Sequence, residues 1–491
     1  MNVKHIFLII IALTVFTTHS FCRIPHRYGN NEYFQISNDS LQFKRHKYPH
    51  LEASLKVFST NMLIWGFDRY IVKEDWAYIN GQTIKNNFKR GPIWDSNCFS
   101  TNMFAHPFHG SIYFNSARTS GLSFGQSIPY VLGGSLMWEF FMESEFPSTN
   151  DLLATTFGGV ALGEMTFRIT DLLVDNRSTG AARVGREIMI GILSPMRAVD
   201  RLISGEAWRV TPYRGNVLSD YPFSVSITGG VRTLYDAKGD DRFKTGGVWM
   251  IETSYGELEK DMSYSPYEWF DFDIELNAAP SSPVISKWES TGILFGKTLE
   301  KQNSKMTFGA FQYFRYHDHQ SSYMHYRLGE AVSLGGGCIY NRKLSNAVNL
   351  ECDMHVSAIP LGASSSDFLI LDRRDYNWGS GYGVKAGIGL VGRNSFHLNL
   401  SSELTHLFSW NGYPEDIDWD NIDPLNYNIQ GDKSNTLGLV CSLKGKYYIT
   451  ENLGLSFTYT NLYRRTDYEY EGIRKHSVND FTLGISYCFR N

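Results

Sequence analysis

The chain has 491 residues, of which 42% are hydrophobic, and its mean hydropathy of -0.27 excludes a bundle of long apolar transmembrane helices. Its formal net charge of -4 is nearly neutral for this length and gives no reason to expect a nucleic-acid partner. The cysteine pattern predicts neither a disulfide framework nor a thiolate zinc site, and no cofactor-binding fingerprint occurs, so we expect no cofactor.

The start of the chain has the pattern of a secretory signal peptide. Basic Lys4 precedes an apolar run that ends at Phe16 and is too short to span a membrane as a helix. A small-residue cleavage site ends at Ser20. We therefore expect an exported protein in which 1–20 is removed and 21–54 is a polar N-terminal segment.

Residues 55–210 have helical rather than strand-like periodicity. Two segments, 124–144 and 150–174, are apolar on all sides and interrupted by small residues, which let helices pack closely. The stretch Pro147-Ser148-Thr149-Asn150-Asp151 offers several capping oxygens before the second segment. The sequence therefore predicts an all-α domain, joined to the rest of the chain by a linker at 211–220.

The densest motifs of the chain lie in this helical domain. They are His106-Pro-Phe-His109-Gly110, Asn115-Ser-Ala-Arg118, Gly134-Ser135-Leu-Met-Trp138-Glu139, Pro147-Ser148-Thr-Asn150-Asp151 and Gly163-Glu164. In this order they resemble the bacterial family called domain of unknown function 3943. The resemblance implies an envelope protein with a helical N-terminal domain followed by a barrel, and it implies no established activity.

Ionisable side chains recur in these otherwise apolar helices, where burial costs free energy and so makes them candidates for function. Two histidines three positions apart could share a helical face, and with a nearby acid they could form a metal site or a general acid–base pair. Pro107 instead favours a helix start, where the rings bond to the backbone. We assign no metal. The candidate catalytic residues are His106, His109, Glu139, Asp151 and Glu164.

A second interpretation of the same helices is structural. Arg118, Glu143 and Arg168 predict a buried ion network that fixes the helix register, in which Glu139 or Glu143 binds either arginine.

Two further motifs resemble catalytic or metal sites. Gly121-Leu-Ser123-Phe-Gly125 matches the GxSxG nucleophile elbow, but that mechanism needs a buried strand before the serine, and no such strand is indicated. His317-Asp318-His319 offers metal ligands, yet it lies at a predicted strand end, where we interpret it as a solvated turn. Neither motif is assigned a function.

The C-terminal part, 221–491, alternates large apolar residues with small or polar ones, as the last strand from Phe481 to Phe489 illustrates. A period of two with one apolar row is typical of a strand in a transmembrane barrel, and a final aromatic strand resembles the signal read by barrel-insertion machinery. The twelve predicted strands are 221–236, 244–257, 268–278, 287–300, 304–316, 326–340, 346–357, 378–392, 394–407, 435–449, 452–464 and 479–489.

The apolar rows could face either lipid or a dry interior. We expect the row Phe270, Phe272, Ile274 and Leu276 to face lipid, because acids and amides occupy the alternate row. In a secreted β-sandwich the same row would instead face inward. The predicted fold is thus an α+β multi-domain chain, with an all-α domain followed by an antiparallel transmembrane β-barrel of about twelve strands.

The charged inner rows predict a hydrated or polar-plugged lumen. Because a barrel of this size has little room for a whole domain, we expect the helices beneath it on the periplasmic side, or against the inner leaflet. The inner-row charges are Asp271, Asp273, Glu275, Glu351, Asp353, Lys385 and Glu403.

Two functions are compatible with these features. The favoured one is a non-catalytic outer-membrane channel, anchor or envelope protein, with the lipid bilayer and the insertion machinery as partners. The alternative is an envelope enzyme that acts on a lipid or lipopolysaccharide-type substrate through the His/Glu/Asp cluster of the helical domain.

Overall fold

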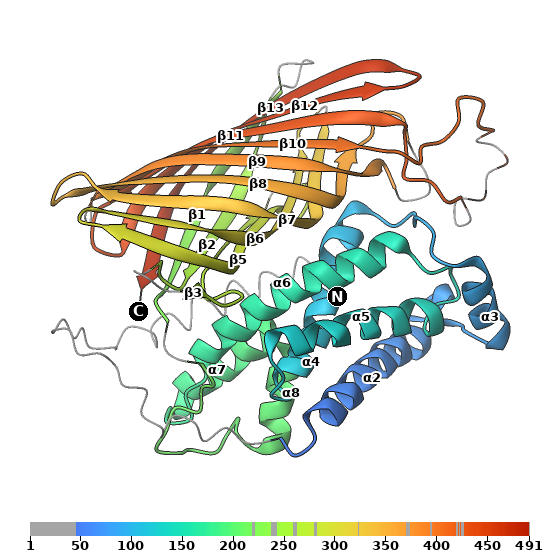
Figure 1. Cartoon of the computed structure of the whole chain (residues 1–491), viewed down its shortest axis with the longest axis horizontal. Helices are drawn as coiled ribbons and strands as arrows, with labels where there is room; N and C mark the ends of the chain where they lie inside the picture. Colours follow the sequence, from blue (N-terminus) through green and yellow to red (C-terminus); the bar gives the residue numbers. More distant parts are fainter. Residues whose placement is uncertain are drawn as a thin grey trace.

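The computed structural model describes residues 46–490, except for short gaps at 219–220, 237–242, 259–262, 279–281, 323, 370–373, 393–394, 419–420, 422 and 424–426. The chain forms a helical domain followed by a β-barrel, as the sequence predicts (Figure 1). The predicted signal peptide and most of the polar N-terminal segment lie outside the described residues.

The helices lie within 55–210, where the periodicity predicts them, except that the first of them begins at Pro49, inside the predicted polar N-terminal segment. Their bounds are α2 (Pro49–Phe67), α3 (Gly81–Arg90), α4 (His106–Arg118), α5 (Phe124–Phe141), α6 (Thr149–Leu173), α7 (Gly180–Leu193) and α8 (Pro195–Ser204), with short turns η2 (Asp68–Val72), η3 (Asp75–Ala77) and η4 (Thr101–Ala105). Ser148 caps α6 by accepting a hydrogen bond from the Asp151 amide. Within the described part of the chain, none of these helices has the length and apolar character needed to cross a membrane alone.

Helices α4 and α6 cross in close backbone contact. A Cβ atom at Gly110 would lie 2.0 Å from the Thr155 carbonyl oxygen, and one at Gly159 would lie 2.6 Å from the Gly110 backbone. Only glycine fits at such a crossing. The two helices therefore form the rigid centre of the domain.

The strands form one antiparallel sheet that closes on itself. The bounds are β1 (Phe223–Asp236), β2 (Phe243–Tyr255), β3 (Ser263–Tyr264), β4 (Phe270–Asn277), β5 (Ile285–Lys301), β6 (Ser304–Gln320), β7 (His325–Lys343), β8 (Val348–Ser365), β9 (Tyr376–Gly392), β10 (Phe396–Phe408), β11 (Ser434–Tyr448), β12 (Leu453–Tyr468) and β13 (Gly472–Arg490). β1 pairs with β13, and β5 pairs with both β4 and β6. Among the described residues, β3 adds only two residues beside β5, and the other twelve strands make the closed barrel.

Charged side chains pair across the inside of the barrel. Arg232 on β1 lies 2.7 Å from Glu275 and also pairs with Asp480. Lys444 on β11 reaches Asp273 on β4, which is not a neighbouring strand, so both side chains point inward. Further inner pairs include Arg315–Glu330, Arg315–Glu403, Lys385–Glu403, Lys287–Glu289, His317–Glu289 and Lys446–Glu252.

An apolar layer lies on the inner face beyond this network. Leu234 follows Arg232 on the same inward row of β1 and is 5% exposed. It packs with inward residues of other strands, namely Tyr326, Leu328, Ile359, Leu407, Val440, Leu462 and Val478. The lumen is therefore lined by side chains that are buried against one another.

The outward rows are apolar, and most of them are uncovered. Leu400, Leu483 and Ile485 are 53%, 70% and 60% exposed, although they belong to the barrel wall. An apolar band on the outside of a closed barrel is the mark of a transmembrane β-barrel. The alternative of a soluble sandwich with its apolar rows inside is thereby excluded.

One stretch of the outer wall is covered by the helical domain instead of lipid. Phe270 and Phe272 of β4 pack with Ala161 and Met165 of α6, and Gln312 of β6 donates a hydrogen bond of 2.9 Å to the Phe157 carbonyl. Figure 1 shows α6 as the helix nearest the strands. The expectations that the β4 row faces lipid and that the helices lie beneath the barrel are therefore wrong.

The α4–α6 crossing gives a direct test of this packing. Gly110→Ala forces the two backbones apart, and such overpacking costs roughly 1–3 kcal/mol of unfolding free energy. The thermal midpoint of the helical circular-dichroism signal should fall in this variant. Gly133→Ala is the matched control, because nothing lies within 4 Å of a Cβ at this α5 glycine, and that variant should be as stable as the parent or slightly more stable.

Candidate functional site

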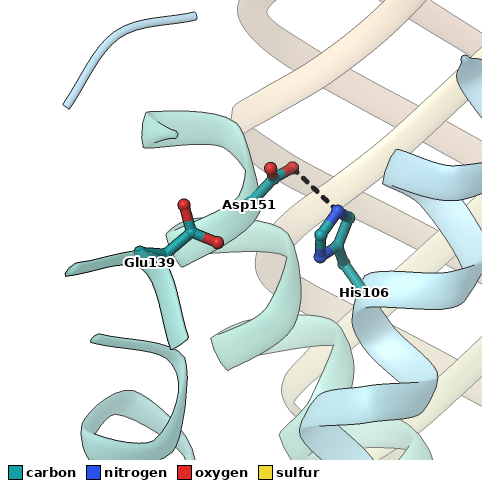
Figure 2. Close-up of side chains that lie close together, drawn as sticks. All are labelled: His106, Glu139 and Asp151. Carbon is teal, nitrogen blue, oxygen red and sulfur yellow. Dashed lines mark ion pairs between the residues drawn. The ribbon is translucent and has the colours of Figure 1, made fainter. Parts of the chain in front are cut away.

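Three of the predicted catalytic residues converge where three helices meet. His106 Nε2 lies 3.3 Å from Asp151 Oδ1, and one ligand atom each of His106, Glu139 and Asp151 lies within 4.8 Å of the others. Figure 2 shows the Asp151 carboxylate facing the His106 ring, with the Glu139 carboxylate beside it. The structure thus brings together side chains that are far apart in sequence.

Local structure places each of the three side chains. His106 is the first residue of α4, which continues directly from η4, so the predicted helix start at Pro107 is wrong. The rings of His106 and His109 contact the side chains of Asp151 and Tyr113 rather than the backbone. Glu139 lies in the last turn of α5 and accepts a 2.7 Å hydrogen bond from the Ser148 amide. Asp151 lies in the first turn of α6. The α6 cap therefore joins the ends of α5 and α6 at the cluster.

Burial shifts the protonation of this cluster toward neutral forms. The His106 side chain is 14% exposed, and burial lowers its pKa to about 4. Burial raises the pKa of Asp151, and the nearby Asp95 raises it further. Burial raises the pKa of Glu139, with Glu143 adding to the effect. No described lysine or arginine forms an ion pair with Glu139 or Asp151, so their charge is not compensated.

Several residues that the sequence analysis missed surround the cluster. The Asp95 carboxylate accepts hydrogen bonds from Asn150 at 2.6 Å and from Asn102 at 2.9 Å. Asn102 also donates to the hydroxyl of Tyr376 on β9 at 2.6 Å, so the polar cluster continues to the barrel wall. Asn150 was visible as part of the helix-capping stretch, but nothing in the sequence links Tyr376 to it.

The remaining candidates lie outside the convergent set. His109 Nε2 is 2.8 Å from the Tyr113 hydroxyl, its ring meets the Trp138 ring edge-on, and burial lowers its pKa to about 3. Glu164 is fully buried between Arg118 and Arg168, at 2.8 and 2.9 Å. The predicted ion network thus forms around Glu164 and not around Glu143.

Glu143 is a further, partly buried acid beside Glu139. Its carboxylate accepts a hydrogen bond from the Trp138 indole, and burial with the neighbouring Glu145 raises its pKa to about 8. Arg168 of the ion network has a second role, because its guanidinium donates to the Pro266 carbonyl at 2.9 Å and ties α6 to the barrel.

The His106, Glu139 and Asp151 side chains are suited to two kinds of chemistry. One imidazole and two carboxylates form a donor set that divalent transition metals accept. A neutral histidine beside a protonated carboxyl group is equally a general acid–base pair. His106 Nε2 faces Asp151 Oδ1 at 3.3 Å without hydrogen-bond geometry and has no other partner among the described residues, so a bound ligand could take the place of this contact.

A second possible metal group occurs inside the barrel. Glu289, His317 and Glu403 also approach within 4.8 Å of one another. The interpretation of 317–319 as a solvated turn is wrong, because β6 continues through these residues and His317 and His319 are each 3% exposed. Lys287 and Lys385 already neutralise Glu289 and Glu403, so the group is part of the lumen ion network.

The convergent cluster lies within the part of the chain that carries the predicted family motifs. Residues 91–196 match the family model of the domain of unknown function DUF3943. The resemblance is thus confirmed for this segment, which includes α4, α5 and α6. His106, Glu139 and Asp151 are all inside the DUF3943 match, whereas Tyr376 belongs to the barrel. No curated protein matches the chain.

Solved structures that resemble the chain are outer-membrane barrels. The NanC porin is 10% identical, with a TM-score of 0.27 over 53% of this chain and 98% of its own. An outer-membrane channel from Pseudomonas putida F1 is 10% identical, with a TM-score of 0.28 over 56% and 97%. The channel DcaP of Acinetobacter baumannii is 9% identical, with a TM-score of 0.23 over 55% and 96%.

The partly buried acid Glu143, beside the His106, Glu139 and Asp151 cluster, predicts that the stability of the helical domain depends on pH. Because the pKa of Glu143 is raised to about 8, the folded state holds a proton that the unfolded state has lost, and stability falls as pH rises toward 8. His106, with its pKa lowered to about 4, is neutral in the folded state above pH 6.5, so it does not oppose this trend. The thermal midpoint of the helical signal should fall between pH 6.5 and 8.

Variants identify the group responsible for that slope. Glu143→Gln keeps an acceptor for the Trp138 indole and should make the dependence shallower, while Glu139 and Asp151, whose pKa values are also raised, keep part of it. Glu451→Gln, at an exposed position in the β11–β12 turn, should leave it unchanged. An unaltered slope in Glu143→Gln would show that another group titrates.

Proposed function

We propose that this chain is an integral outer-membrane protein whose barrel is a closed, non-catalytic anchor for its helical domain. In this proposal, 221–491 spans the outer membrane, and 55–210 is held against it through the linker at 211–220. The bilayer and the barrel-insertion machinery are its partners. The sequence left the roles of channel, anchor and envelope protein open, and we favour the anchor over the channel.

The packing of side chains inside the barrel supports the proposal that the barrel is closed. Arg315 and Glu330 meet at 2.7 Å with 6% and 1% of their side chains exposed, and Arg232 joins β1, β4 and β13. Breaking one partner of such a buried pair leaves an uncompensated charge, so the network resists opening. The apolar layer that includes Leu234 and Leu462 lies beyond it on the inner face. An ion crossing the barrel would have to displace both.

Conductance separates an anchor from a channel. Purified protein reconstituted in planar bilayers should give no steady conductance, because paired charges and apolar side chains occupy the lumen. Heat-modifiable migration on gels verifies that the inserted barrel is folded. Reproducible unitary currents from such folded protein would refute the anchor and support a channel.

The convergence of His106, Glu139 and Asp151 favours a second candidate, an envelope enzyme that acts on a lipid or lipopolysaccharide-type substrate. Its support is the buried cluster without a cationic partner, because ionisable groups with perturbed pKa values cluster at functional sites. In that role the neutral His106 would accept a proton from the substrate, while a protonated carboxyl group of Asp151 or Glu139 would donate one.

Substitutions at the cluster separate the two candidates. For an enzyme, His106→Ala and Asp151→Asn should leave the barrel heat-modifiable and lower turnover by roughly 100-fold or more, seen by mass spectrometry as the lipid profile of a deletion strain. For an anchor, the same variants should instead lower the melting temperature and barrel yield, with a lipid profile like that of the parent. Glu451→Gln, at an exposed position in the β11–β12 turn outside the helical domain, should change neither quantity.

A further inference from the structure

Helices α2 and α5 expose apolar side chains on the side away from the barrel. Leu55, Phe58 and Leu63 of α2 are 55%, 51% and 74% exposed, and Leu132, Leu136 and Phe141 of α5 are 44%, 38% and 42% exposed. The two helices are neighbours, since Asn61 of α2 donates a 3.0 Å hydrogen bond to the Gly134 carbonyl of α5. Their exposed residues form what we call the outer helical face.

This face lies at the level of the apolar band of the barrel. Phe157 near the middle of α6 accepts a hydrogen bond from Gln312 near the middle of β6. Val160 of α6 packs in one cluster with Val57 of α2 and Val131 of α5. Figure 1 shows α2, α5 and α6 running side by side along the barrel, with α6 between the strands and the other two. The outer helical face is therefore displaced sideways from the wall, and not beyond its end.

The barrel wall beside the helices is itself apolar and uncovered. Phe295 on β5 and Phe308 on β6, on the same strands that α6 covers farther along, are 66% and 43% exposed. The apolar band thus continues from the open wall to the helical domain. There α6 covers the wall, and the exposed apolar surface is formed by α2 and α5 instead. The outer helical face extends the lipid-facing surface around the domain.

Charges are distributed as a bilayer would require. Neither 57–67 of α2 nor 124–138 of α5 contains Asp, Glu, Lys or Arg, and charged residues resume at Asp68 and at Glu139. Lys56, at the start of the uncharged stretch of α2, is paired with Asp200 at 2.8 Å. The ionisable groups of α4 and α6 point toward the interior of the domain, as Glu164 does between its two arginines. Exposed charges such as Glu74 and Lys85 lie outside the two uncharged stretches. Water-exposed domains rarely show a continuous apolar face of this kind.

We infer that the outer helical face contacts the acyl chains of the bilayer, so that the helical domain lies in the membrane beside the barrel. The inference rests on the proposed membrane placement of the barrel. It replaces a periplasmic position with a lateral one. No single helix has to span the bilayer for this contact, because only one side of the bundle meets lipid and its polar groups stay inside.

Site-specific photocrosslinking tests the contact. Benzoylphenylalanine is introduced at Leu63 or at Leu136, whose exposed side chains leave the core unchanged, and the protein is irradiated in nanodiscs of phosphatidylethanolamine and phosphatidylglycerol. Leu483, 70% exposed on β13, is the matched barrel control, and exposed Glu471 in the β12–β13 turn is the aqueous control. Heat-modifiable migration verifies folding of every variant.

Phospholipid adducts at Leu63 and Leu136, at a yield within about threefold of that at Leu483 and at least tenfold above that at Glu471, are the expected result. Adducts at Leu483 without adducts at Leu63 and Leu136 would overturn the lateral placement alone. A crosslinked second copy at those helical positions would overturn it as well, in favour of a dimer. Absence of adducts at Leu483 would refute the membrane barrel itself.

Discussion

The alternation of side chains along each strand is the constraint on which the structure depends. Closing the sheet commits every second residue to the lumen and the others to the outside. The inward row carries Arg232, Glu275 and Arg315, whose charges are stable there only when each one finds a partner. The outward row is apolar and must meet lipid or protein. Both the packed lumen and the position of the helices follow from this division.

On part of the wall, the helical domain covers the outward apolar row in place of lipid. Helix α6 lies on the row that includes Phe270 and Phe272, and its contacts are apolar over most of their length. A few polar contacts fix the alignment, such as Gln312 with Phe157 and Arg168 with Pro266. Apolar burial supplies the attraction, and these hydrogen bonds set the register in which α6 docks.

The same arrangement isolates the His106, Glu139 and Asp151 cluster from basic side chains. Glu164 in the middle of α6 has two arginines, whereas Glu139 and Asp151 form no ion pair with a lysine or arginine of the described residues. An anchor would not require such an uncompensated group, since the arginine network already fixes the helices. This contrast is why the enzyme remains a second candidate beside the anchor, and why the cluster and the lumen call for separate experiments.

The sequence by itself determined the strands, the main helices and the family motifs, because each depends on local periodicity. Alternation from Phe481 to Phe489 or capping at Ser148 can be recognised without any distant contact. It did not determine which wall α6 covers, because an outward row such as that of β4 has the same pattern under lipid and under a helix. It also placed Glu164 with the catalytic candidates and missed Tyr376, because only the tertiary packing decides which buried acid meets an arginine and which strand reaches the helix ends.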